Sequence, residues 1–137
     1  MPVPGSLRKM PIDEGQIAEL LSRQFNLPTE ETRAYLKLLD TSNLTLEQLA
    51  SALSLTEEAT KALVASMIAR GLMIEAIGIP KRFAPLHPRM TLTNIFKTYE
   101  KELVQSLRDR RATVDRVVNL LIPVYEDRKP EVGKTKG

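Results

Sequence analysis

The sequence contains no cysteine, no tryptophan and only one histidine. The absence of cysteine excludes disulfides, thiolate metal sites and a cysteine nucleophile. The single imidazole, His87, supplies at most one member of a zinc site or a catalytic triad, and we expect it to be a linker residue. We therefore expect no metal, no cofactor and no enzymatic activity.

Long apolar runs are also missing. No stretch approaches the roughly 18 to 20 apolar residues that span a bilayer, and residues 1–12 lack the apolar core of a secretion signal. Aromatic residues make up only 4% of the chain, and its apolar content favours helical packing over a β-sandwich. A length of 137 residues suits one compact domain, or a small domain with an extended element. We expect a mostly helical, cytoplasmic protein with no membrane partner.

Charge is divided unevenly along the chain. The sequence carries 20 Lys or Arg and 17 Asp or Glu, a net charge of +3. Residues 1–71 hold seven basic and nine acidic side chains, a net of −2, whereas residues 72–137 hold 13 and eight, a net of +5. The mild overall excess of basic residues permits nucleic-acid binding. The uneven distribution predicts that the positive surface lies in the second half of the chain.

Apolar residues at helical spacing, separated by caps and breakers, predict short helices in the first half. Residues 1–10 are predicted to be a disordered lead. Thr29 and Thr56 are predicted N-caps, and Thr45 with Gln48 forms a capping box. The predicted helices cover residues 11–25, 29–39, 45–53 and 56–70.

The last of these helices is expected to bury one apolar stripe and to end at Gly71, which suits a C-terminal cap. The predicted stripe is Ala59, Leu63 and Met67, with Ile68 as a further candidate. Thr60 and Lys61 are expected to face outward from it.

A hairpin is predicted next, with strands over residues 72–77 and 81–86 and a turn at residues 78–80. Pro85 requires an edge position, because proline cannot donate to a ladder. Three short helices followed by a hairpin are the order of a winged helix-turn-helix. We predict this fold, mostly α (α+β) with a two-stranded wing, over residues 11–87. The helix over residues 11–25 is then an extra N-terminal helix of this domain.

One long helix, residues 88–122, is predicted after the wing, with residues 123–137 as a basic disordered tail. So long a helix cannot bury itself on a small domain, so we predict a coiled-coil dimerisation helix. Its N-terminal end is expected to touch its own domain and its C-terminal end a second copy. The predicted interface residues are Ile95, Phe96, Tyr99, Leu103, Val114, Val117 and Leu121.

The winged fold predicts how DNA would be bound. The third helix would enter the major groove, and the basic hairpin would contact the phosphates beside it. The predicted DNA-binding residues are Thr45, Thr56, Thr60, Lys61, Lys81 and Arg82.

Several segments resemble one known family, the archaeal TrmB-type transcriptional regulators, in their N-terminal winged-helix part. The matching segments are residues 31–39, 45–50, 66–72 and the wing Gly78-Ile79-Pro80-Lys81-Arg82-Phe83. The resemblance covers roughly residues 27–121 and does not reach the sugar-binding domain that many members carry. It implies a DNA-binding regulator that pairs through the long helix.

The leading expectation is therefore a homodimeric, DNA-binding transcriptional regulator acting on double-stranded DNA. An alternative follows from Glu57 and Glu58, which place two negative charges at the start of the recognition helix. Phosphates would be repelled there, whereas a basic protein partner would be attracted. This alternative is a winged-helix interaction module or adaptor of transcription or chromatin machinery with only weak, non-specific DNA binding.

Overall fold

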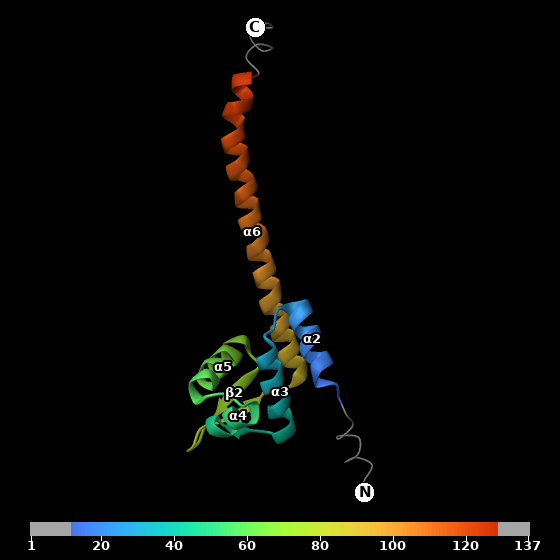
Figure 1. The fold of residues 1–137 in the computed structure, drawn as a ribbon, viewed down its shortest axis with the longest axis vertical. Coiled ribbons are helices and arrows are strands. Elements are labelled where there is room, and N and C mark those ends of the chain that lie inside the picture. The colour runs from blue at the N-terminus through green and yellow to red at the C-terminus, as the bar shows by residue number, and fades with distance from the viewer. Residues whose placement is uncertain (1–11, 129–137) are drawn as a thin grey trace. The chain divides into compact units, whose positions relative to one another are not determined.

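The structure, a computed structural model, describes residues 12–128. The predicted lead over residues 1–10 and residues 129–137 of the predicted tail lie outside the described residues. The described chain is mostly helical with one small sheet, which confirms the predicted winged helix-turn-helix class (Figure 1). Its elements are α2 (Glu14–Phe25), α3 (Thr29–Thr41), β1 (Leu44–Thr45), α4 (Leu46–Leu53), α5 (Glu57–Arg70), β2 (Met73–Ala76), β3 (Arg82–Pro85) and α6 (Pro88–Arg128).

Contacts divide the chain after Tyr99 into two units. The first holds α2 to α5, the sheet and the first turns of α6, and the second begins at Glu100. The domain boundary expected between residues 87 and 88 therefore lies inside the first unit, because the first turns of α6 pack on the winged domain.

The caps of the short helices follow local side-chain chemistry. Thr45 and Gln48 form the predicted capping box, and the Thr56 hydroxyl accepts the Ala59 N–H at the start of α5. The helix predicted from residue 11 begins only at Glu14, where Asp13 accepts from the third residue of the helix. The predicted cap at Thr29 is wrong, because α3 already includes this residue and has no side-chain cap.

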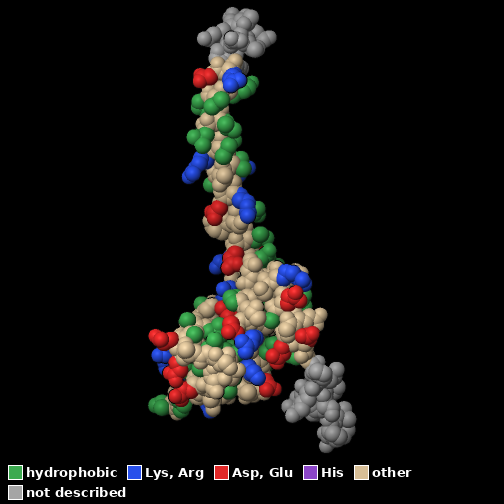
Figure 2. Space-filling view, in the orientation of Figure 1, with side chains coloured by type: hydrophobic (Ala, Val, Ile, Leu, Met, Phe, Trp, Pro, Cys, Tyr) green, Lys and Arg blue, Asp and Glu red, His purple; other side chains and the backbone are tan. Residues whose placement is uncertain are grey.

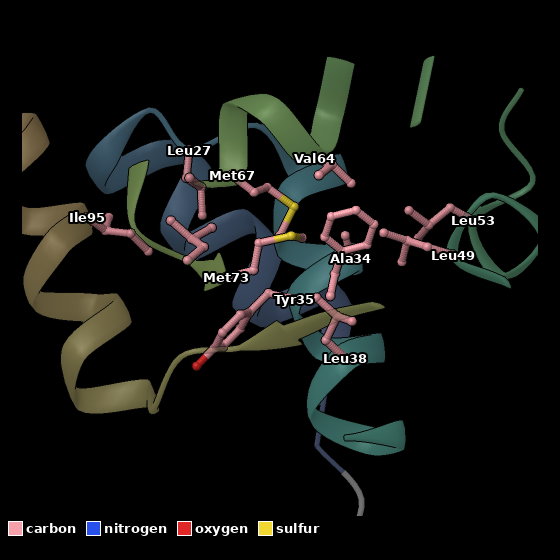
Figure 3. Close-up of a cluster of buried hydrophobic side chains, with 12 residues drawn as sticks. Leu27, Ala34, Tyr35, Leu38, Leu49, Leu53, Val64, Met67, Met73 and Ile95 are labelled. Carbon is pink, nitrogen blue, oxygen red and sulfur yellow. The ribbon is translucent and has the colours of Figure 1, made fainter. Parts of the chain in front are cut away.

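The core lies where α3, α4, α5 and the sheet meet (Figure 3). Helix α3 contributes Ala34, Tyr35 and Leu38, of which Ala34 and Leu38 are fully buried. Helices α4 and α5 add Leu49, Leu53, Val64 and Met67, and the cluster is completed by Leu27, Leu72, Met73, Phe83 and Ile95. Burial of these apolar side chains is the main source of stability.

The buried face of α5 differs from the predicted stripe. Ala59 is exposed and Leu63 only half-buried, whereas Thr60, Val64 and Met67 point inward. The spacing of these three, at i, i+4 and i+7, is as helical as the predicted one. Thr60 can be buried because its hydroxyl donates to the Thr56 carbonyl at 2.7 Å.

The start of α6 belongs to the winged domain. Ile95 is 4% exposed and lies in the core, so its predicted place in a dimer interface is wrong. Phe96 and Tyr99 stack edge to face on Phe25, with ring centroids 6.4 and 5.7 Å away. Tyr99 is half-buried by these contacts, while Phe96 remains 53% exposed.

The sheet has three strands, in the order β1-β3-β2, rather than the two predicted. The short strand β1 pairs Leu44 with Phe83 and Thr45 with Arg82. Strand β3 is therefore central at Arg82 and Phe83, but Pro85 itself lies at an edge position, as predicted. Proline is tolerated because Pro85 pairs only with Met73 of β2, beyond the reach of the two-residue β1.

Helix α6 runs for 41 residues, about 60 Å at 1.5 Å per residue. The predicted end at residue 122 is wrong, because the helix continues through Pro123 to Arg128. Proline removes one backbone hydrogen bond and crowds only the turn before it, so the residues after Pro123 can remain helical. Within residues 12–128, no helix is both long and apolar enough to cross a bilayer.

The turn from α5 into β2 provides a test of the fold. Gly71 has a φ of +82°, and a Cβ there would lie 2.3 Å from Asn94 Nδ2. We expect Gly71→Ala to lower the free energy of unfolding by about 1 to 3 kcal/mol, from both backbone strain and the clash. Urea unfolding followed by circular dichroism measures this loss.

Gly15→Ala is the matched control, since its Cβ would meet nothing closer than 3.5 Å within α2. It should leave stability unchanged or raise it by roughly 0.5 to 1 kcal/mol. Equal stability of both variants would contradict the described geometry at Gly71.

Candidate nucleic-acid interface

A groove of about 560 Å³ lies between α5 and the β2–β3 hairpin. The start of α4 closes one end of it. Its lining residues are Thr45, Leu46, Glu47, Lys61, Val64, Ala65, Ile68, Glu75, Pro80, Lys81 and Phe83. The structure thus brings Thr45, Lys61 and Lys81, three of the predicted DNA-binding residues, to one groove.

A fourth predicted residue, Arg82, adjoins this group through the sheet. Arg82 pairs with Thr45 across β1 and β3, so the α4 cap and the wing cation are direct cross-strand neighbours. The Arg82 side chain is exposed, and it has no ion pair within residues 12–128.

The second wing cation, Lys81, has an acidic neighbour. Its Nζ lies 3.5 Å from Glu75 Oε2 on the opposite strand, and the two side chains are 70% and 44% exposed. A pair this open is weak and screened by salt, so Lys81 can exchange Glu75 for another anion at little cost.

The start of α5 carries both predicted and corrected residues. Thr56 is exposed and caps the helix, and Lys61 is exposed one turn later. Thr60, by contrast, is fully buried, with its hydroxyl bonded to the Thr56 carbonyl. The prediction that Thr60 faces a groove is therefore wrong, and this residue instead anchors α5 to the core.

Acidic side chains border the same region. Glu57 and Glu58 are exposed in the first turn of α5, where the helix dipole favours negative charge. Neither makes an ion pair among the described residues. The start of α5 is therefore acidic, and the positive charges of this face stand one turn later and on the hairpin.

A buried carboxylate positions α5, and sequence reasoning missed it. Glu31 of α3 is 3% exposed; its Oε2 accepts from Ser66 Oγ at 2.7 Å and its Oε1 lies 3.2 Å from Arg70 Nε. The sequence places Glu31 in a first helical turn, where solvent exposure is the usual outcome. Its only signal was that Glu31, Ser66 and Arg70 all fall in segments that carry the family resemblance.

A second set of hydrogen bonds fixes the start of α6. Tyr35 donates to the Leu86 carbonyl at 2.7 Å, and Asn94 Nδ2 donates to the Gly71 carbonyl at 2.9 Å. Burial raises the pKa of Tyr35, against a smaller lowering by its hydrogen bond with Thr91, so the hydroxyl stays protonated as a donor.

The groove has none of the chemistry of a metal centre. Across the part of the chain that the structure describes, no three His, Asp or Glu side chains lie close enough together to hold a metal ion. The one imidazole, His87, accepts the Arg89 N–H at 3.0 Å through Nδ1, which caps the first turn of α6. What the groove offers is a largely apolar lining with two cations, Lys61 and Lys81, and two carboxylates, Glu47 and Glu75.

Comparison with known proteins agrees with this geometry, although no known family model matches the chain. The chain is 25% identical over 118 residues to the DNA-binding HTH-type transcriptional repressor TrmBL2 of Thermococcus kodakarensis, covering 86% of the chain and 45% of that protein. It is 24% identical over 122 residues to the putative HTH-type transcriptional regulator TrmBL2 of Pyrococcus furiosus, covering 89% of the chain and 46% of that protein. The chain thus spans less than half the length of either relative.

Solved structures show the same fold. TrmBL2, described as an archaeal chromatin protein with a novel mode of DNA binding, superposes with a TM-score of 0.70 at 24% identity, over 86% of this chain and 47% of that one. A point mutant of S. aureus MepR bound to an oligodeoxyribonucleotide superposes with a TM-score of 0.50 at 16% identity, over 81% of this chain and 89% of that one.

The relatives are named as transcriptional regulators and not as enzymes, in agreement with the expectation from the sequence. Their matches extend over the same winged-helix segments that carry the resemblance in the sequence. The chain is thus similar to proteins named TrmBL2 over its winged helix-turn-helix and the long helix that follows it, at 24 to 25% identity.

Proposed function

We propose that the protein is a homodimeric DNA-binding transcriptional regulator. The observation that carries this proposal is the groove in which Lys61 of α5, Thr45 at the cap of α4 and Lys81 of the wing meet. Phosphates of a duplex are fixed by such separated cations and hydroxyls, while a helix beside them reads base edges. The sequence relatives named as DNA-binding or transcriptional regulators support the same function.

In this proposal α5 enters the major groove with its first turns. Thr56 and Lys61 are its exposed polar side chains able to donate to base edges there. Thr45, Lys81 and Arg82 contact phosphates, with Lys81 leaving Glu75 to do so. Thr60 makes no contact with DNA, because its side chain is buried on the inner face of α5.

Glu57 and Glu58 make the interface selective in this proposal. A carboxylate repels phosphates but accepts a hydrogen bond from cytosine N4. Two glutamates at the leading end of α5 therefore disfavour random duplex and favour sites that place cytosine beside them. They reduce general affinity and raise the requirement for a matching sequence.

Dimerisation is proposed through the second unit of α6. Its apolar side chains are exposed along the helix (Figure 2). Leu103, Leu107, Val114, Val117, Leu121 and Val124 are between 43% and 60% exposed. They alternate at spacings of three and four residues, and Arg110 fills the one polar position of the series.

Such a 3.5-residue period is that of a left-handed coiled coil. An isolated helix with this stripe would leave six large apolar side chains in water, so a second copy is the simplest partner. Twofold pairing would call for an operator with two related half-sites one helical turn, or a multiple of it, apart.

The wing cations provide the first test of this function. We expect Lys81→Ala/Arg82→Ala to weaken binding to every duplex and to reduce the slope of log K against log salt by about one to two units, because one or two phosphate contacts are lost. Fluorescence anisotropy with labelled duplex across a salt series measures both effects. Arg23→Ala/Lys37→Ala removes the same charge from α2 and α3, which do not line the groove, and should leave the slope unchanged. An unchanged slope in the wing variant would refute the assignment.

The proposed coiled-coil seam of α6, formed by the exposed apolar residues named above, provides the second test. Val114→Glu/Leu121→Glu would bury two charges in the coiled coil, so the variant should sediment as a monomer where the parent chain is a dimer. Ala112→Glu/Asn119→Glu adds the same charges away from the seam, at exposed positions, and should remain dimeric. Identical sedimentation of the seam variant and the parent would exclude this interface.

A second candidate function is docking of a basic protein segment on α5, favoured by the exposed and unpaired state of Glu57 and Glu58 within the described chain. The variant Glu57→Gln/Glu58→Gln distinguishes these two candidate functions. For a DNA-binding protein, anisotropy should show tighter binding to scrambled duplex and a smaller preference for the operator. For a docking module, DNA binding should be weak in the parent and differ little between sequences.

A further inference from the structure

The hairpin ends in an apolar tip, Ile77-Gly78-Ile79-Pro80. Ile77 and Ile79 are 106% and 103% exposed, higher than any other large apolar side chain of residues 12–128. Figure 2 shows hydrophobic side chains at this free end of the hairpin, at its lower left. The two isoleucines do not contribute to the core.

Polar residues normally occupy such a turn, because a tip is surrounded by water. Ile77, Ile79 and Pro80 would each gain by leaving water, since transfer of apolar surface out of water is favourable. An exposed apolar group of this kind marks a contact site. The question is which partner the surroundings of the tip select.

Charge near the tip selects a polyanion. Lys81 and Arg82 follow the tip directly, and no acidic residue lies between Glu75 and Arg82. Glu75 itself is paired with Lys81. The tip is therefore an apolar wedge flanked by cations, which complements a groove with apolar sugar walls and phosphates along its edges.

The position of the tip selects the minor groove. Pro80 and Lys81 line the same groove as α5, so the hairpin stands beside the recognition helix. With α5 in the major groove, the hairpin reaches over one phosphate backbone to the adjacent minor groove. Isoleucine and proline are among the side chains that enter minor grooves as wedges, separating a base step and bending the duplex.

We propose that Ile77 and Ile79 enter the DNA minor groove next to α5 and open one base step, while Lys81 and Arg82 hold the flanking phosphates. This inference rests on the proposed DNA-binding function. It adds a second means of selection, because flexible steps such as TA and CA open more easily than others. Sequence preference then arises at a position where the protein makes no hydrogen bond to a base.

The test uses the full chain, a 30-base-pair duplex carrying a donor and an acceptor dye at its ends, and the variant Ile77→Ser/Ile79→Ser. Energy transfer measures bending, and anisotropy across a salt series measures affinity and salt slope. We expect the variant to lose the bend and to bind about tenfold more weakly, with an unchanged salt slope, because the phosphate contacts remain. Its unfolding midpoint should match the parent's, since both isoleucine side chains are fully exposed.

Ile74→Ser is the matched control. Ile74 is 49% exposed on the same hairpin, and it alternates with Glu75, so it faces away from the groove that Glu75 lines. It should bend and bind DNA as the parent does.

Two results would overturn the inference while DNA binding stands. One is an Ile77→Ser/Ile79→Ser variant that bends and binds as the parent does. The other is a changed sedimentation coefficient of that variant without DNA, which would make the tip a contact between copies of the chain. Failure of the proposed function gives a different result, since the parent itself would then not bind duplex even at low salt.

Discussion

The buried carboxylate of Glu31 is the interaction on which the position of α5 depends. A carboxylate that is 3% exposed needs compensating partners, and α5 supplies two: Ser66 donates a hydrogen bond to Oε2, and the Arg70 guanidinium forms an ion pair with Oε1. Buried ion pairs of this kind add little net stability, but they penalise any other register of the two helices. The apolar contacts of Val64 and Met67 can slide at small cost, whereas the Glu31 contacts cannot. The orientation of the exposed face of α5 is thus set from the opposite side of the helix.

That exposed face and the hairpin share one groove because the sheet links them. Strand β1 extends the cap of α4 into a ladder with β3, so Thr45 and Arg82 are held as neighbours. Gly71 turns the chain sharply from α5 into β2, and Asn94 of α6 bonds to its carbonyl. Helix α5, the hairpin and the first turns of α6 are therefore linked by strand pairing and by the Asn94 hydrogen bond.

Local chemistry predicted most of the fold. The capping box at Thr45, the cap at Thr56 and the glycine end of α5 are short-range signals, and each is present in the structure. The errors lie partly at helix ends, as at Thr29 and after residue 122, and partly where burial or a distant contact decides. Thr60 was expected to face a DNA groove and Ile95 to join a dimer interface, whereas Thr60 is buried with its hydroxyl donating to the Thr56 carbonyl, and Ile95 lies in the core. The pairing of β1 with β3 and the burial of Glu31 depend on residues 35 or more positions away, which no local pattern reports.

We propose that one face of the molecule, built from the caps of α4 and α5 and the hairpin, binds duplex DNA. The measurement is to record amide ¹⁵N–¹H spectra of the full chain during titration with a duplex from the upstream region of its own gene. We expect chemical-shift changes to concentrate in residues 45–47, 56–65 and 75–83, while the signals of α2 and α3 stay unchanged. Shifts concentrated in α2 and α3, or no shifts at DNA excess and low salt, would contradict it.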